Sequence, residues 1–123
     1  MIGTLGEPNL RACCIPDYID IAVNKADCVH FIPDENILNN VFACQYINSP
    51  ETLLLASSMV HGQTRTRISS GQIANLPIYL PPVNLQNQFA DFVTKVEQQK
   101  TTVQKSIEKL ETLKKSLMQE YFG

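Results

Sequence analysis

The sequence predicts an α+β protein in which a small domain of mixed strands and helices, residues 1–83, is followed by one long C-terminal coiled-coil helix, residues 84–123. Two observations lead to this prediction. All seven prolines and four of the five glycines lie in the first 83 residues, so that region is rich in turns. The last forty residues contain no proline, and their apolar side chains recur at spacings of mostly three and four, as in an amphipathic helix.

Short elements are expected within the first region. Apolar and β-branched runs bounded by Asn, Asp and Pro predict strands at Asp20–Asn24, Cys28–Ile32 and Pro77–Pro81. The glycines of Gly3–Gly6 predict a tight turn between strands. Helical spacing predicts short helices over 37–47, which Asn48-Ser-Pro50 should stop, and over 51–60, with one helical turn over 72–76.

The last region should begin its helix at Asn84, a favourable N-cap, and continue for about 37 residues or roughly 55 Å. A domain of about 80 residues spans only roughly 25–30 Å, so much of the apolar stripe should need a partner helix. The alternative is that the helix folds back over its own domain. The residues expected at the helix-partner interface are Phe89, Val93, Val96, Val103, Ile107, Leu110, Leu113 and Leu117.

Composition excludes several classes of protein. With 123 residues, 44% of them hydrophobic and 18% charged, the chain is neither disordered, collagen-like nor disulfide-rich. It has no apolar run long enough for a membrane span and no signal peptide, so we expect a cytoplasmic protein. The net charge of -2 argues at first against nucleic-acid binding. However, it divides into -5 over 1–60, +2 over 61–83 and +1 over 84–123.

Catalytic and metal-binding motifs are not evident. The chain contains no phosphate-binding glycine loop, zinc-protease motif or nucleophile elbow, and Leu80-Pro-Pro-Val83 lacks the polar residue of an amino-methyltransferase turn. We therefore predict neither an enzyme nor a cofactor. The cysteines, which form no C-x-x-C pair, are interpreted as small buried apolar residues in a reducing compartment. His30, near Cys28 and Cys44, is the only hint of a metal cluster and is interpreted as structural.

The segment from His61 to Gly71 is a polar loop whose side chains suit contacts with phosphates and base edges. An arginine can form paired hydrogen bonds with guanine, and a glutamine with adenine. The alternative is a solvated loop whose arginines pair with the acidic first region. The candidate DNA-binding residues are His61, Gln63, Thr64, Arg65, Thr66 and Arg67.

The order of these parts resembles the DNA-specificity subunit of type I restriction-modification systems. The strongest signal is Gly62 through Gln86, which contains an Ile-Ser pair, then Leu-Pro-Ile-Tyr-Leu-Pro-Pro and a helix start with Gln86, followed by a long helix ending Leu-Lys-Lys-Ser-Leu-Met-Gln-Glu-Tyr-Phe. Gly3–Gly6 resembles the family's glycine turn, and Tyr46–Pro50 resembles its helix end. The chain departs from the family pattern at Leu85, where a Glu is usual.

The resemblance implies a non-catalytic protein. In the family, each target-recognition domain reads one half of a bipartite site in double-stranded DNA, and two long helices pack antiparallel as a spacer. Methyltransferase subunits dock on this assembly and flip the target adenine, and a restriction subunit can join. A family target-recognition domain is about twice as long as residues 1–83, so we expect a partial domain. A homodimer through the C-terminal helix would then imitate the two-domain subunit.

Two rival hypotheses belong to other classes. In the first, the chain is a protein-interaction or dimerisation fragment whose truncated domain no longer reads DNA. In the second, it is a thiol or zinc enzyme that uses Cys28, His30 and Cys44.

Overall fold

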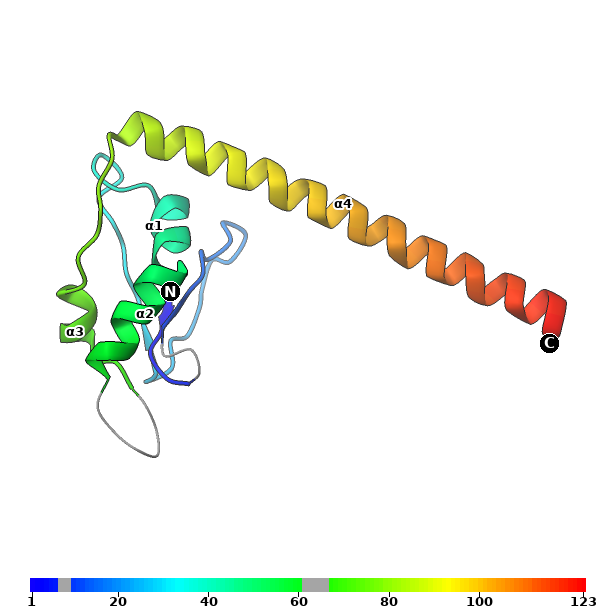
Figure 1. Ribbon diagram of the computed structural model, residues 1–123, viewed down its shortest axis with the longest axis horizontal. Helices are drawn as coiled ribbons and strands as arrows, with labels where there is room; N and C mark the ends of the chain where they lie inside the picture. The colour runs from blue at the N-terminus through cyan, green and yellow to red at the C-terminus, as the bar shows by residue number, and fades with distance from the viewer. Residues whose placement is uncertain (7–9, 61–66) are drawn as a thin grey trace. The chain divides into compact units, whose positions relative to one another are not determined.

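The computed structural model describes residues 1–6, 10–60 and 67–123 (Figure 1). It confirms the α+β class. By its contacts the chain forms two compact units, Met1–Gln88 and Phe89–Gly123. The elements in chain order are β1 (Ile2–Gly3), β2 (Arg11–Ala12), β3 (Cys28–Val29), α1 (Asn40–Ile47), α2 (Pro50–Met59), α3 (Ser70–Ala74) and α4 (Val83–Phe122).

The sheet of the first unit has three short antiparallel strands in the order β2-β1-β3. Ile2, in the central strand, lies opposite Ala12 on one side and Val29 on the other. The pairing continues past the strands, because the Thr4 amide donates to the Asp27 carbonyl oxygen at 2.9 Å and the Cys13 amide to that of Met1 at 2.9 Å. The prediction of a turn at Gly3 is wrong, because Gly3 lies in β1; Gly6 alone among the described non-terminal positions has a positive φ, 113°.

The helices follow local capping signals. The Asn39 side chain accepts from the amides of Val41 and Phe42 and starts α1. Ser49 caps α2, in which Pro50 occupies the first turn without losing an intrahelical hydrogen bond. Ser69 and Gln72 form a reciprocal capping box at α3. The helices expected over 37–47 and 51–60 are therefore present with shifted starts, and the predicted stop at Asn48 is confirmed.

Two of the expected strands differ from the structure. Asp20–Asn24 is not a strand, because no described strand lies beside it to complete a ladder, and its Ile21 and Val23 side chains are exposed. Cys28–Ile32 is a strand only at its first two residues.

The strand expected at Pro77–Pro81 is absent, and this segment is irregular because its prolines lack amide donors.

The expected N-cap of the long helix is also wrong. Asn84 is not the N-cap, because α4 already begins at Val83, and the Pro82 carbonyl oxygen accepts from the Gln86 amide at 3.2 Å.

The core of the first unit lies between the sheet and the short helices. Its buried residues come from β1, α1, α2 and the segments that join the elements: Ile2, Leu10, Ile47, Ala56, Ile68 and Leu76. Leu10 and Ile68 are each only 1% exposed. Ile68 directly follows the polar segment 61–67, so the C-terminal end of that segment is fixed by core packing.

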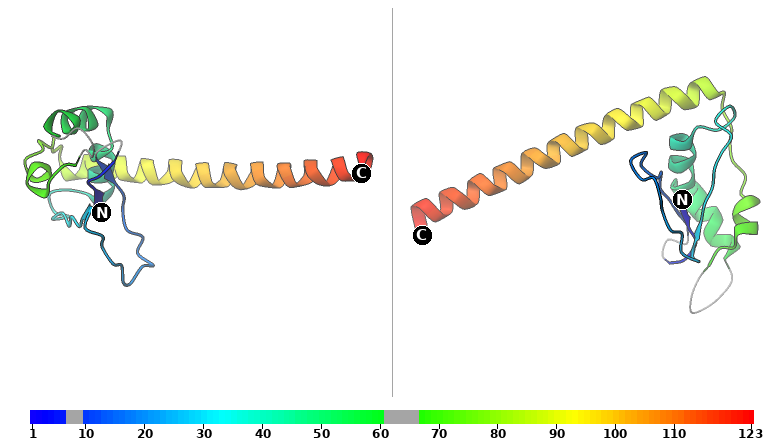
Figure 2. Two further views of the ribbon diagram at one scale, coloured as in Figure 1. Left: turned by 90° about the horizontal axis from the view of Figure 1, so that it is seen from below. Right: turned by 180° about the vertical axis from the view of Figure 1, so that it is seen from behind.

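The helix α4 contains 40 residues, which gives a length of about 60 Å. Both views in Figure 2 show it as one continuous helix without a kink. It contains no proline that would interrupt the backbone hydrogen bonds. Among the described helices, none combines the length and apolar character that crossing a membrane requires.

Candidate nucleic-acid interface and helix stripe

The part of the polar segment predicted to contact DNA, residues 61–67, lies between α2 and α3 in the sequence. Five of its candidate residues, His61, Gln63, Thr64, Arg65 and Thr66, lie outside the described residues, whereas Arg67 lies within them. On the N-terminal side, the carbonyl oxygen of Met59 accepts from the Gln72 side-chain amide at 2.5 Å. This bond ties the end of α2 to α3.

The C-terminal end of the segment is attached to the sheet. Arg67 forms an isolated antiparallel bridge with Leu5, and the Ile68 amide donates to the Thr4 carbonyl oxygen at 3.1 Å. Segment 61–66 therefore joins two points that tertiary hydrogen bonds hold in place. Binding residues often lie between elements that are fixed in this way.

Arg67 forms an ion pair with Asp27 in the part of the chain that the structure describes. Asp27 is itself held in place, because both the amide and the hydroxyl of the buried Thr4 donate to its carbonyl oxygen at 2.9 Å. The side chains remain accessible, with 56% of Arg67 and 37% of Asp27 exposed. Such an exposed pair stabilises the fold little, but it orients the guanidinium group at the edge of the sheet.

Gln86 connects the beginning of α4 to the domain. Its side chain is fully buried and uses every hydrogen-bonding group: the oxygen accepts from the Asn39 amide at 2.9 Å, and the nitrogen donates to the carbonyl oxygens of Ile37 at 3.0 Å and Pro81 at 2.7 Å. A second contact joins the Asn39 side chain to Asn87 at 2.9 Å. The start of α1 and the first turn of α4 are thus fixed together.

Beyond its first turns, α4 carries a seven-residue repeat. Its d positions are all apolar: Phe89, Val96, Val103, Leu110 and Leu117. At the a positions, apolar or aromatic residues alternate with lysines. The former are Val93, Ile107 and Tyr121, and the latter are Lys100 and Lys114. Large apolar side chains on this stripe are exposed, including Ile107, Leu110 and Leu117. A repeat of this kind is typical of a helix that packs against another helix.

The model of the type I restriction modification DNA specificity domain matches residues 17–112. The chain belongs to this family. The match covers α1, α2, α3 and most of α4, and so includes the polar segment and the part of the helix stripe that ends at Leu110. No solved structure matches the chain.

Family membership confirms the resemblance drawn from the segment Gly62–Gln86 and the helix that follows it. The chain thus has a type I restriction-modification specificity role, in a family of non-catalytic, DNA-binding subunits. Within the matched region, Gln86 belongs to the family-like motif, but the sequence alone assigned no role to its side chain. The sequence signal that could have pointed to this role is a polar residue in the first turn of α4, soon after Pro81.

A further contact in the specificity domain was not predicted. The Asn48 side chain pairs with both backbone groups of Ala12: its oxygen accepts from the amide at 2.8 Å, and its nitrogen donates to the carbonyl oxygen at 2.8 Å. The side chain thus completes the hydrogen bonding at the outer edge of β2, where a further strand would otherwise be needed. Asn48 was expected only to end α1, and no sequence signal pointed to this pairing.

The cysteines of the specificity domain differ from the prediction. Cys13 and Cys14 are exposed and Cys28 and Cys44 are partly buried, so the interpretation as buried apolar residues is wrong for the first two. Cys13 and Cys14 directly follow β2 and are not part of the buried core cluster. Among the described residues, no three His, Cys, Asp or Glu side chains converge as metal ligands, and His30 is exposed.

Proposed function

We propose that this chain reads one half of a bipartite site in double-stranded DNA and docks methyltransferase subunits, with a restriction subunit able to join. The observation that supports this most strongly is the match to the specificity domain over residues 17–112. Because the chain carries no catalytic motif, chemistry on the DNA would belong to its partners. Such a complex would work in the cytoplasm.

DNA contact is assigned to the polar segment. Arg65 and Arg67 would contact phosphate or guanine, and His61, Gln63, Thr64 and Thr66 would add polar contacts. The guanidinium group has five donor hydrogens, so Arg67 can keep its bond to Asp27 and still offer donors to DNA. With so few positive charges, affinity should be weak until methyltransferase subunits also hold the duplex.

Self-association is assigned to the α4 stripe. In a parallel pair, Lys100 and Lys114 would each face the same lysine of a second copy, whereas in an antiparallel pair they face d-position apolar residues. If Ile107 lies opposite Val103 of the second copy, Lys100 lies beside Glu111 of that copy and Lys114 beside its Glu97. This charge complementarity favours an antiparallel homodimer.

The test of DNA reading uses the complex reconstituted with its methyltransferase subunits. Arg65→Ala with Arg67→Ala should weaken specific DNA binding by about 10-fold or more and lower its dependence on salt between about 50 and 200 mM. Lys105→Ala with Lys109→Ala removes the same charge at exposed positions of α4 outside the stripe and should leave binding nearly unchanged. Equal affinities for both double variants would contradict the assignment.

The alternative function is a protein-interaction module that no longer reads DNA. The ion pair between Arg67 and Asp27 favours it, because it neutralises one of the two arginines of the segment. Sedimentation and a DNA titration distinguish the two functions. A dimer that fails to bind DNA even with methyltransferase present would support the alternative.

A further inference from the structure

One face of α1 is lined by three residues spaced four apart, Asn40, Cys44 and Asn48. The segment that leaves β2 runs along this face. Asn48 pairs with the backbone of Ala12 as described above, and two residues later the Cys14 thiol donates to the Asn40 carbonyl oxygen at 3.7 Å. Ala12 thus contacts the end of α1, and Cys14 contacts its first turn. Cys44 lies on the same face between these two contacts, so the Cys14 side chain lies close to it.

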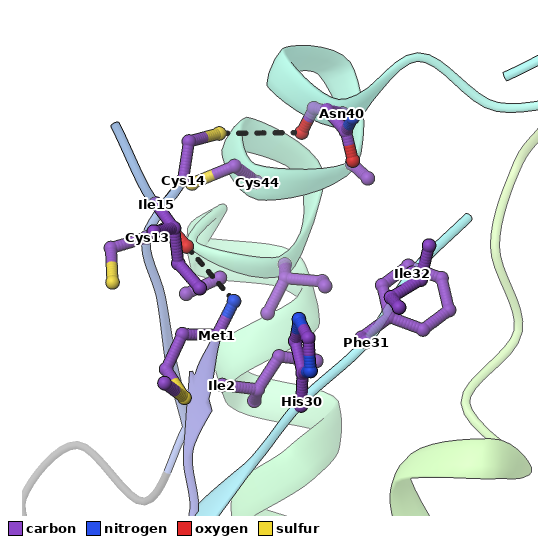
Figure 3. A pocket seen from close by; sticks show the side chains of 13 residues that line it. Met1, Ile2, Cys13, Cys14, Ile15, His30, Phe31, Ile32, Asn40 and Cys44 are labelled. Carbon is purple, nitrogen blue, oxygen red and sulfur yellow. Dashed lines mark hydrogen bonds between the residues drawn. The ribbon is translucent and has the colours of Figure 1, made fainter. Parts of the chain in front are cut away.

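The two neighbouring cysteines of this segment point in different directions. Figure 3 shows the Cys14 side chain directed toward α1 and beside Cys44, whereas the Cys13 sulfur points away from the helix. Successive side chains of an extended chain alternate in this way. Cys44 has a further sulfur contact, because the Asn48 side-chain nitrogen donates to its Sγ at 3.7 Å. Cys14 and Cys44 both line a pocket that also contains His30 and Ile32.

We propose that Cys14 and Cys44 form a site of reversible oxidative modification, at which a low-molecular-weight disulfide converts the two thiols into an intramolecular disulfide. In the first step, the Cys14 thiolate attacks one sulfur of the oxidant and releases one thiolate, which leaves a mixed disulfide. In the second step, Cys44 loses its proton to solvent, attacks the Cys14 sulfur and displaces the second thiolate. The protein loses two electrons and two protons, and the oxidant is reduced to two thiols.

The order of the two steps follows from the surroundings of each sulfur. Burial, reinforced by the neighbouring Cys14, raises the pKa of Cys44 to about 11. Little Cys44 thiolate is therefore present near neutral pH, whereas Cys14 is exposed to the oxidant. The second step should limit the rate and should accelerate by about tenfold for each pH unit up to about 11.

The disulfide would constrain a part of the chain that has few tertiary contacts of its own. It would close the loop between residues 14 and 44, which contains the exposed irregular segment Ile19–Val23. Cross-linking a loop of about 30 residues removes conformations from the unfolded state and stabilises the folded one. The melting temperature of the first unit should rise by roughly 10 °C.

The experiment uses the full chain in which Cys13→Ser and Cys28→Ser leave only the proposed pair. After incubation with oxidised glutathione, mass spectrometry should show a monomer that has lost two hydrogen atoms and carries no glutathione, and dithiothreitol should reverse the change. The rate of closure should rise with pH, and the melting temperature should rise on closure.

The matched control carries Cys14→Ser and Cys28→Ser, so that Cys13 replaces Cys14 as the possible partner of Cys44. It should accumulate glutathione adducts rather than an intramolecular disulfide. Stable glutathione adducts on the Cys14–Cys44 protein at high pH would overturn the proposal. Closure that is equally fast in the control would overturn it as well, because proximity specific to Cys14 would then be excluded.

Discussion

The first unit and the long helix are stabilised by different kinds of contact. In Met1–Gln88, side-chain amides bond to backbone groups far away in the sequence: Gln86 with Asn39, and Asn48 with Ala12. From Ala90 onward, the described side-chain hydrogen bonds of α4 join groups only three or four residues apart, as between Thr94 and Ala90 or Lys100 and Glu97. Local bonds of this kind stabilise a helix weakly. The first unit is therefore held together by bonds within its own chain, whereas we propose that the α4 stripe packs against another helix.

The largest effect is expected from substitutions that remove the proposed helix-helix contacts of α4. Leu110→Glu with Leu117→Glu places two carboxylates at d positions, where a second helix would bury them. We expect sedimentation to show dimer affinity reduced by about 100-fold or more, with loss of helical signal by circular dichroism. The first unit should keep its own melting transition.

A control variant adds the same two charges at the same spacing, but outside the stripe. It shows whether the position of the carboxylates on α4, rather than their added charge, causes the loss of dimer. Thr112→Glu with Gln119→Glu adds two carboxylates to the opposite face of the helix and should leave the dimer intact. If both double variants sediment alike, the stripe is not the interface and the contrast between the two units fails.

The next largest effect concerns the buried amide of the first unit. Gln86→Met preserves much of the volume but leaves the Asn39 amide and the carbonyl oxygens of Ile37 and Pro81 without their partner. The free energy of unfolding should fall by about 2–4 kcal/mol, measured by urea denaturation. Gln88→Met, at an exposed position two residues away, should change it by less than about 0.5 kcal/mol. If both variants changed the free energy of unfolding equally, the hydrogen bonds of the buried Gln86 side chain would add nothing to the stability of the first unit.

A smaller effect is expected at the sheet edge. Asn48→Ala removes both hydrogen bonds to the Ala12 backbone, and the free energy of unfolding should fall by about 1–2 kcal/mol. Hydrogen exchange should show the Ala12 amide exchanging faster. Gln45→Ala, at an exposed position of the same helix, is the comparison variant. Unchanged exchange at Ala12 would show that the side chain does not protect the strand.

The smallest effect is expected for the ion pair at the polar segment. Asp27→Asn removes the charge partner of Arg67 and should lower the free energy of unfolding by less than about 1 kcal/mol, because both side chains are partly exposed. The loss should shrink in high salt, whereas Asp20→Asn, which is exposed, should show no such dependence. A loss of several kcal/mol would mean that Arg67 serves the fold, and would weaken its assignment to DNA.

Particular residues show which features of the fold and of the candidate site the sequence could predict. The distribution of prolines and the spacing of apolar residues predicted one long helix after a turn-rich domain, and Asn48-Ser-Pro50 predicted the break between α1 and α2. Asp20–Asn24 has the composition of a strand, yet a strand also needs a neighbour, and none is present among the described residues. Of the candidate DNA-binding residues, Arg67 could be placed, and its assignment remains a prediction.

By itself, the sequence determined the presence of the helices, the family and the apolar repeat of α4, because helix caps, proline breaks and the seven-residue period act over a few neighbouring residues. Only the tertiary structure decided what the polar side chains do. It placed Asn48 against Ala12, Gln86 against Asn39, Arg67 against Asp27 and Cys14 beside Cys44. These partners lie about 30 to 47 residues apart, and their pairing depends on how the chain folds rather than on any short pattern.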